Sequence, residues 1–521
     1  MSATLFTGGR IHTGTGASAE ALLSRDGTIV AVGRHADLAR DAGRAERIDL
    51  RGGLMVPGWT DAHVHFMWWA IQMDQVDLRD SATLDDALAR VAERARALPE
   101  GAWLVGGRFD KNRWGRWPTA AELDRVTHGH PAALRSRDGH SRWLNSAALR
   151  AAGIGAATIP PAGGEIERDA AGEPTGILKE NANWLVDAVV PSPSLDERLA
   201  ALRRGQVEAW RRGVTGIEDL EPANAREAFA VLDGRGELGL RVEMGIPRGD
   251  LSEATAAGLR TGTGGEWLRT GHCKIFTDGA LGSQTAALEE PYEGSDSRGI
   301  LTIEPDDLAA DVTRAAAAGI AVAIHAIGDR AVRVALDAIE PTRRSHPALR
   351  QRIEHVQLVR EDDLARFGRL GVIASMQPIH ATSDRDLVDR YWGTARARRA
   401  YPWRTLASHG AVLAFGSDAP VEPIDPLLGI HAAVARQRPG DSDRWHPEQA
   451  LTLDEALAGY AAGAAHATGR ERERGTLVPG LRCDATIVER DLAAVPVGEW
   501  PEIGVSGTVT GGVVRHAGGL G

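Results

Sequence analysis

The sequence predicts an α/β protein: a closed TIM-like (β/α)₈ barrel with a cap insertion after strand 1, plus a small β-sandwich formed from both termini. Three observations lead to this prediction. From about residue 200 onward short apolar runs alternate with helical periods, both chain ends are rich in short strands, and a long segment is left over between the first two barrel strands. At 521 residues the chain is long enough for one large domain and a satellite.

The two chain ends carry the pattern of a β-sandwich. Short apolar runs separated by Gly turns, such as ATLFTGGRIH and GTIVAVG, are typical of small antiparallel strands, and the carboxyl end repeats this in CDATIVERD and GTVTGGVVRHAG. We therefore assign residues 1–56 and 471–521 to one sandwich domain. The run GTGASA at 14–19 matches a dinucleotide-binding fingerprint, but no helix follows it, and so we interpret it as a hairpin.

Residues 57–470 carry the pattern of the barrel. Helical stretches alternating with short apolar strands indicate βαβ units and a parallel sheet. Eight such strands complete a closed barrel, whereas an open doubly wound sheet is the alternative. Their sequences are MVPGWTDAHVH, VTGIEDL, LRVEMGI, HCKIF, IAVAIHAI, QRIEHVQL, GVIASMQP and AVLAFGSD.

Residues 67–190 lie between the first and second barrel strands and are predicted to form an inserted cap domain. The segment contains strand-like runs such as WLVGGRFD, turn-rich runs such as PPAGGEIERDAAGEPTG, and several Trp residues. Loops that follow barrel strands lie at the catalytic face, so an insertion here should cover the site.

Composition narrows the classes of partner. The net charge of −11, without a Lys/Arg-rich block, argues against nucleic acid and gives no support for an anionic membrane surface. The two cysteines predict no disulfide framework and favour a reducing cytoplasm. No signal-peptide pattern or long apolar window occurs, so we expect no transmembrane helix. A small-molecule substrate is expected, and the oligomeric state stays open, with a homodimer as one option.

Polar side chains gather where the predicted barrel strands end, which is where barrel enzymes keep their chemistry. Residues two apart on a strand face the same way, so the first two histidines of the set can share one cation. Any one of these residues could be structural, but together they predict a metal site. The six are His63, His65, Lys274, His325, His355 and Asp418.

The residue types fit particular metals. Four imidazoles and one carboxylate suit Zn²⁺, with Mn²⁺, Fe²⁺ or Co²⁺ as competitors. A buried lysine tends to lose its proton. The neutral amine of Lys274 can then add carbon dioxide to give a carbamate, which is an anion able to bridge two metal ions.

Further residues at this face are candidates for substrate binding. For those in the cap the alternatives are a tight turn in RSRDGHS and packing of the cap onto the barrel by indoles. For Asp278 a supporting role behind the ligands is the alternative. The candidates are Trp69, Arg137, His140, Asp278, Gln377 and His380.

The motifs DAHVHF, CKIF, AIHAIGD, RIEHVQ and FGSDAP resemble the amidohydrolase superfamily. Within it, LRSRDGHSRWLNSAAL, KIFTDGALGSQTA and GSDAPVEPIDPL resemble the YtcJ-like branch, amidohydrolase family 3, which includes N-substituted formamide deformylases. The resemblance implies one or two metal ions. It places His63 and His65 on one ion, His325 and His355 on a second, and carboxylated Lys274 between them. Asp418 would bind the first ion and handle protons.

These features together predict a metal-dependent hydrolase that cleaves an amide or related C–N bond with metal-activated water. A deaminase or a cyclic-amide hydrolase on the same barrel is the alternative within enzymes. A non-catalytic metal-binding module is a further alternative, but it would not need Asp418 beside an open metal site. Serine hydrolysis is disfavoured because no Gly-x-Ser-x-Gly elbow occurs.

Overall fold

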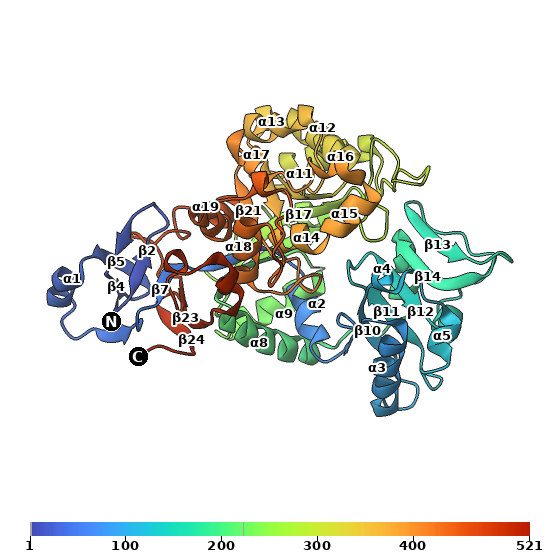
Figure 1. The fold of residues 1–521 in the computed structure, drawn as a ribbon, viewed down its shortest axis with the longest axis horizontal. Coiled ribbons are helices and arrows are strands. Elements are labelled where there is room, and N and C mark those ends of the chain that lie inside the picture. Colours follow the sequence, from blue (N-terminus) through green and yellow to red (C-terminus); the bar gives the residue numbers. More distant parts are fainter. Residues whose placement is uncertain (1–2, 222) are drawn as a thin grey trace.

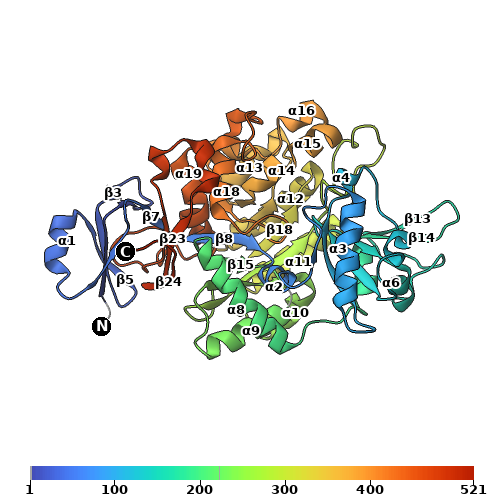
Figure 2. The same cartoon turned by 60° about the horizontal axis from the view of Figure 1, so that its bottom comes forward.

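The computed structural model of the protein describes residues 3–221 and 223–521. Three regions follow one another along the long axis in Figure 1. A β region holds both chain ends, a barrel occupies the centre, and a cap of strands and short helices lies at the far end. Figure 2, turned by 60°, keeps the same order of regions.

The central region is a parallel sheet of eight strands that closes almost completely into a barrel. Hydrogen bonds from Asp418 N to His63 O (2.7 Å) and from His65 N to Ala419 O (2.9 Å) join its first strand to the segment after its last. The eight predicted strands are therefore confirmed. In sheet order they are β8 (Trp59–Val64), β15 (Val214–Asp219), β16 (Arg241–Pro247), β17 (Leu268–Phe276), β18 (Val322–Ala326), β19 (Arg352–His355), β20 (Ile373–Met376) and β21 (Leu413–Phe415).

The first predicted barrel strand is divided between two sheets. Its beginning, β7 (Leu54–Pro57), pairs with strands of the terminal region, and only β8 belongs to the barrel. Gly58 lies at the crossing, where an added Cβ would be 2.5 Å from Thr215 Oγ1. The prediction of one continuous strand was wrong because this close approach lets the chain change sheets within a single extended run.

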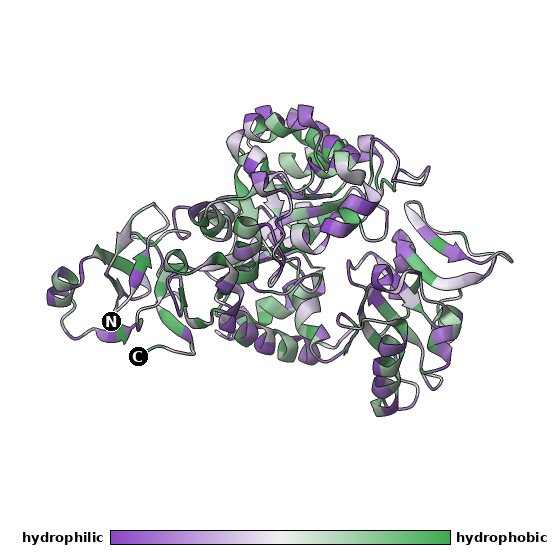
Figure 3. Ribbon diagram, in the orientation of Figure 1, coloured by the Kyte–Doolittle hydropathy of each residue, from purple (hydrophilic) through white to green (hydrophobic). Residues whose placement is uncertain are grey.

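Helices surround the barrel as the alternating pattern predicts. The helix α8 begins with a capping box, in which Ser194 Oγ accepts from Glu197 N and the Glu197 carboxylate accepts from Ser194 N. On another side of the barrel, the helices over 305–317, 329–345 and 361–370 pair apolar inner faces with polar outer faces, seen as green and purple in Figure 3. Within the described ranges, the α-helices between the barrel strands and after the last one are α8 (Leu195–Arg211), α9 (Ala223–Gly234), α10 (Leu251–Ala256), α11 (Pro305–Ala317), α12 (Asp329–Ser345), α13 (Glu361–Leu370), α14 (Pro378–Ser383), α15 (Arg385–Tyr391), α16 (Gly393–Ala397), α17 (Trp403–Ser408), α18 (Pro426–Ala435), α19 (Leu453–Ala458) and α20 (Ala464–Ala467).

The terminal region contains two sheets that pack around buried side chains including Phe6, Ile29 and Val509. The four-stranded sheet has the order β5 (Thr28–Gly33), β4 (Ala21–Arg25), β1 (Ala3–Thr7), β6 (Glu46–Asp49). The six-stranded sheet has the order β24 (Val513–Ala517), β23 (Val505–Thr510), β22 (Ala485–Val488), β7, β2 (Arg10–His12), β3 (Ser18–Ala19).

Pairing within these sheets is less uniform than expected. The strands β2 and β3 pair antiparallel, which agrees with the hairpin expected at 14–19. However, β1 pairs parallel with β6, and β2 pairs parallel with β7. The prediction of purely antiparallel strands was wrong at these two pairs. A periodicity of two reports that a strand exists but not the direction of its partner.

The cap is built on a mixed sheet of six strands, and short helices pack beside it. The sheet order is β13 (Gly164–Arg168), β14 (Pro174–Glu180), β12 (Ser141–Leu144), β11 (Ala132–Ser136), β10 (Leu104–Phe109), β9 (Val76–Asp77). Its helices are α3 (Leu84–Ala97), α4 (Lys111–Trp114), α5 (Ala120–Asp124), α6 (Ser146–Ala151) and α7 (Trp184–Asp187). The helix α2 (Phe66–Gln72), which opens the segment predicted as cap, instead packs in the barrel core with Leu199 and Phe229.

Candidate metal centre

Three ligand-type residues from separate strand ends meet inside the barrel mouth. The ligand atoms of His63, His355 and Asp418 lie within 4.8 Å of one another, and all three residues are buried. His63 Nε2 is 3.5 Å from Asp418 Oδ1, and His65 Nε2 is 3.4 Å from the same oxygen. His325 lies beside them, with its ring centroid 4.6 Å from that of His355. The tightest group thus takes one histidine from each of the two expected pairs.

In both histidines of this tightest group, Nδ1 faces away from the cluster and lies close to an acceptor oxygen. His63 Nδ1 is 2.6 Å from Glu354 Oε2, and His355 Nδ1 is 2.8 Å from Gln377 Oε1. These oxygens fix the proton on Nδ1, so the lone pair remains on Nε2. Metal-binding histidines are held in this way in proteins.

His325 repeats the pattern and supplies the clearest test of fit. Its Nδ1 is 3.0 Å from Asp278 Oδ1, and within the described part of the chain its buried Nε2 has no hydrogen-bond partner. A buried polar atom without a partner is costly. The orphaned Nε2 points to a missing ligand, and a divalent cation of the borderline class fits this donor set.

Asp278 is held behind His325 rather than in the pocket. Its carboxylate accepts from the backbone N–H groups of Ala287 (2.9 Å), Ile327 (3.1 Å) and Gly328 (2.8 Å). Burial raises the pKa of Asp278 to about 7, although these hydrogen bonds oppose the shift. Of the two alternatives left open for Asp278, this geometry favours the supporting role.

The floor beneath the histidines is a buried ion-pair network that the sequence reasoning missed. Arg352 Nε donates to Glu354 Oε1 (2.5 Å), and the same guanidinium pairs with Glu218. Glu218 Oε1 is 2.5 Å from His272 Nδ1. All four side chains are fully buried. Because Glu354 holds His63, this network sets the orientation of that imidazole. The alternating charges of RIEH, inside an apolar strand, are the signal that could have revealed it.

Lys274 points into the same space. Its Nζ is 3.4 Å from His63 Nε2 and 4.8 Å from the centre of the Phe276 ring. Burial lowers the pKa of Lys274 to about 8, even though Glu354 and Asp418 favour its charged form. The amine is therefore easier to deprotonate than an exposed lysine, which is the property that the predicted carbamate requires.

The backbone is strained at two of the three clustered residues. His355 has a φ of 71° and Asp418 a φ of 58°, in the left-handed region that side-chain-bearing residues seldom adopt. Such strain persists where surrounding structure enforces it, and it concentrates at functional sites.

Asp418 lies between the histidine cluster and His380. Its Oδ1 faces His63 and His65, while its Oδ2 is 3.2 Å from His380 Nε2. Burial opposes its ionisation, yet the neighbouring His63 and His380 hold the pKa of Asp418 well below its ordinary value. Burial also opposes the charge on His380, but the nearby carboxylates of Asp418 and Glu422 raise its pKa to about 10.

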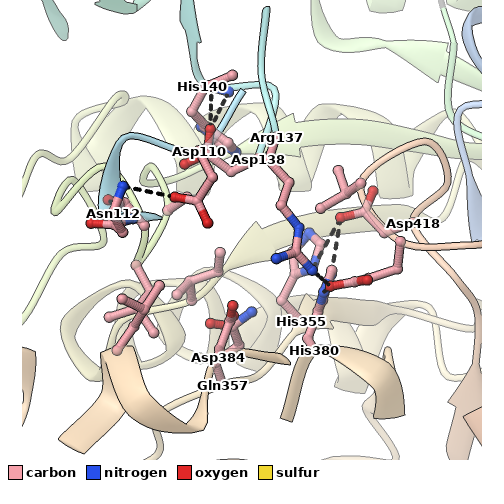
Figure 4. Close-up of a pocket in the computed structure, with 18 of the residues that line it drawn as sticks. Asp110, Asn112, Arg137, Asp138, His140, His355, Gln357, His380, Asp384 and Asp418 are labelled. Carbon is pink, nitrogen blue, oxygen red and sulfur yellow. Dashed lines mark hydrogen bonds and ion pairs between the residues drawn. The ribbon is translucent and has the colours of Figure 1, made fainter. Parts of the chain in front are cut away.

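A pocket opens from this cluster toward the cap, and both regions line it (Figure 4). Arg137 and His140, both expected at the site, enter from the cap. His140 Nδ1 is 2.8 Å from Glu180 Oε2, and its ring centroid is 5.2 Å from that of His325. Lining residues that the sequence did not indicate are Phe109, Asp110, Lys111, Asn112, Trp117, Ser136, Ala280, Leu281, Gly282, Ile327, Gln357, Asp384, Leu387, Val421 and Glu422.

Besides Asp278, two of the expected substrate-binding residues lie outside the pocket. Trp69 packs against Phe66, with ring centroids 5.2 Å apart, in the core between α2 and the barrel helices. Gln377 stands behind His355. Neither residue lines the pocket. Tertiary packing decides which way these two side chains point, and the local sequence does not report that packing. The missed Trp117 belongs to the same Trp-rich segment, so composition marked the region but not the residue.

Comparison with known proteins decides the family. Residues 46–516 match the family described as Amidohydrolase family. The chain belongs to this family. Across 98% of its length the chain is 32% identical to the putative amidohydrolase YtcJ of Bacillus subtilis (strain 168), and the alignment covers 99% of that protein. It is 31% identical to an N-substituted formamide deformylase of Arthrobacter pascens, over 96% of this chain and 95% of that protein.

Comparison with a solved structure agrees with the two sequence comparisons. The amidohydrolase superposes on an uncharacterized metal-dependent hydrolase from Pyrococcus horikoshii OT3 with a TM-score of 0.78 and 28% identity, covering 95% of this chain and 99% of that one. The resemblance inferred from the motifs is confirmed, and the protein is a metal-dependent amidohydrolase. Across the described ranges, none of its helices combines the length and apolarity needed to cross a membrane.

Proposed function

We propose that this amidohydrolase cleaves an amide or related C–N bond, such as that of an N-substituted formamide or N-acyl amine. The observation that carries the proposal is the convergence of inward-facing imidazole nitrogens and Asp418 at the base of a pocket roofed by the cap. The 31% identity to an N-substituted formamide deformylase over most of the chain supports this substrate class.

The proposed ligands are His63, His65, His325, His355 and Asp418, with carboxylated Lys274 between two ions. Zn²⁺ is the first candidate, and Mn²⁺, Fe²⁺ or Co²⁺ would suit the same donors. When bound, such an ion lowers the pKa of water to about 7 and polarises a carbonyl oxygen.

Asp418 is the residue placed to move protons. Its low pKa keeps it ionised, so it can accept the proton of the attacking water and pass it to the leaving nitrogen. His380 donates to Asp418 Oδ2 and fixes the direction in which the carboxylate faces. Oδ1, on the other side, faces the histidines.

The pocket walls bind the rest of the substrate. Phe109, Trp117 and Leu281 offer apolar surface, while Asn112 and Gln357 offer hydrogen-bonding groups. A mostly apolar wall with a few polar groups is typical of pockets for small organic molecules. We therefore propose that the amine or acyl substituent lies against the cap.

The test is a substrate panel with metal-loaded protein: N-formyl amines, N-acyl amino acids, aryl amides, cyclic imides and amino-heterocycles, with Zn²⁺ or Mn²⁺ added. Release of formate or another acid together with an amine, abolished by a chelator, is the expected result. Release of ammonia from an amino-heterocycle would replace the proposal with a deaminase, and ring opening of an imide with a cyclic-amide hydrolase. Lack of turnover across the panel contradicts the proposed substrate class.

A further inference from the structure

The cap reaches the reacting carboxylate through a chain of contacts. Arg137, which follows β11 of the cap, donates from Nη2 to Glu422 Oε1 across 2.5 Å. Glu422 belongs to the barrel side, in the loop after β21. The Glu422 side chain is 6% exposed, so its charge is removed from water and depends on this partner.

The contacted oxygen also serves two barrel residues. Ser383 Oγ donates to Glu422 Oε1 (2.6 Å), and His380 Nδ1 lies 3.6 Å from it. The other nitrogen of His380 is 3.2 Å from Asp418 Oδ2. The cap guanidinium is thus connected through one carboxylate and one imidazole to Asp418, as Figure 4 shows for the labelled Arg137, His380 and Asp418.

Each link in this chain limits the position of the next. Burial opposes ionisation of Glu422, but Arg137 and then His380 lower its pKa to about 2, so it stays charged. Both ring nitrogens of His380 face carboxylates, so the ring can turn only if one of these contacts is given up. Without Arg137, Oε1 of Glu422 keeps only the Ser383 hydroxyl as a hydrogen-bond donor, so the carboxylate is held less firmly on the far side of His380.

We propose that Arg137 is a positioning residue, supplied by the cap, that acts through Glu422 and His380 to orient Asp418. The barrel alone then holds an incomplete site, which the docked cap completes. The proposal rests on the proposed function in one respect, namely that Asp418 handles the proton. It differs from the expectation that Arg137 contacts substrate, because a substrate contact would act mainly on KM.

The first experiment separates these roles by kinetics on any substrate that the panel identifies. Arg137→Ala should lower kcat by about 100-fold, the loss that a misplacement near 1 Å causes, while KM stays within about twofold. Added guanidinium chloride should restore part of kcat. Glu422→Gln should lower kcat similarly, and the double variant should be little worse than either single variant, because both break the same chain.

Tyr391→Phe is the matched control. It removes another hydrogen bond between barrel and cap, from Tyr391 Oη to Asn112 Oδ1 (2.8 Å), without touching the chain to Asp418. Its kcat should match that of the unmodified protein. An equal loss of kcat in Tyr391→Phe would mean that general docking of the cap is responsible, and a change confined to KM in Arg137→Ala would mean substrate contact. Either result overturns the proposal.

A structural readout does not depend on turnover. In a crystal structure of metal-loaded Arg137→Ala, the contact between His380 Nε2 and Asp418 Oδ2 should be lost while metal content is unchanged. Retention of that contact overturns the proposal even if activity falls. If the unmodified protein hydrolyses nothing in the panel, the proposed function fails, whereas this comparison of structures still decides the coupling. Arg137→Lys replaces Arg137→Ala if the latter does not fold.

Discussion

The two walls of the pocket are held in place in different ways. On the barrel side His63, His325 and His355 are buried, and each has an acceptor behind its Nδ1. On the cap side Lys111 and Asn112 are only partly buried and lie on the short helix α4. A rigid wall suits chemistry, which demands fixed distances, whereas a looser wall can change with the substrate. We infer that the barrel supplies the reacting groups, and that the cap, apart from the positioning role proposed for Arg137, selects the substrate.

On the barrel side of the pocket, the largest loss of activity is expected when a proposed metal ligand is removed. His63→Ala should lose bound metal by elemental analysis and fall below about one thousandth of the original activity, because metal activation of water is lost. A chelator should do the same to the unmodified protein, and added Zn²⁺ should reverse it. Full metal content and turnover in His63→Ala would remove this residue from the site.

Lys274 tests whether the rigid wall includes a modified side chain. Metal-loaded protein should carry about 44 Da of added mass on Lys274, since burial favours the neutral amine that takes up carbon dioxide. Lys274→Ala should lose about 100-fold or more in kcat and recover partly with short carboxylic acids plus metal, which replace the missing bridge. Lys274→Arg keeps a permanent charge and should not be rescued. An unmodified amine in an active, fully metal-loaded protein would contradict this prediction.

Loss of a residue that holds a ligand in place should weaken metal binding less than loss of the ligand itself. Glu354→Gln removes the charge behind His63 and should weaken metal binding by about 10- to 100-fold, the usual effect of losing such a partner. The matched control is Glu243→Gln on β16, one strand beyond Glu218 of the network, which alters a buried ion pair with Arg470 (3.1 Å). That variant should lose stability but keep its metal affinity. Equal metal affinities in the two variants would mean that the network only stabilises the fold.

The smallest effects are predicted for Trp117 and Trp69, one on KM and the other on the free energy of unfolding. Trp117 lines the pocket, so Trp117→Ala should change KM by about tenfold for substrates with a large substituent, the effect expected from losing 1–2 kcal/mol of apolar contact. Trp69 packs on Phe66, so Trp69→Ala should cost about 2–3 kcal/mol in the free energy of unfolding with little change in KM. Thermal melts and steady-state kinetics on both variants measure the difference. The opposite pattern would put Trp69 in the pocket.

The features that could be predicted are those whose pattern lies within a short stretch of sequence. The barrel strands repeat apolar runs between helical periods, and His63 and His65 share a short spacing, so both were accessible to prediction. The contact between His63 and Glu354 joins residues 291 positions apart, and no local pattern reports it. The direction of Trp69 depends on how α2 packs against α8, which is likewise decided by tertiary structure.

The sheet shared by β7 and β22 affects when the first barrel strand can be fixed in place during synthesis. The strand β22 pairs with β7, and β7 runs through Gly58 directly into β8, which bears His63. The first barrel strand is therefore anchored by a strand that leaves the ribosome long after it. Domains usually fold as units while the chain emerges, amino-terminal parts first. In this protein we expect the proposed metal site to mature only after β22 has been released, so a nascent chain should gain metal affinity abruptly once β22 has emerged.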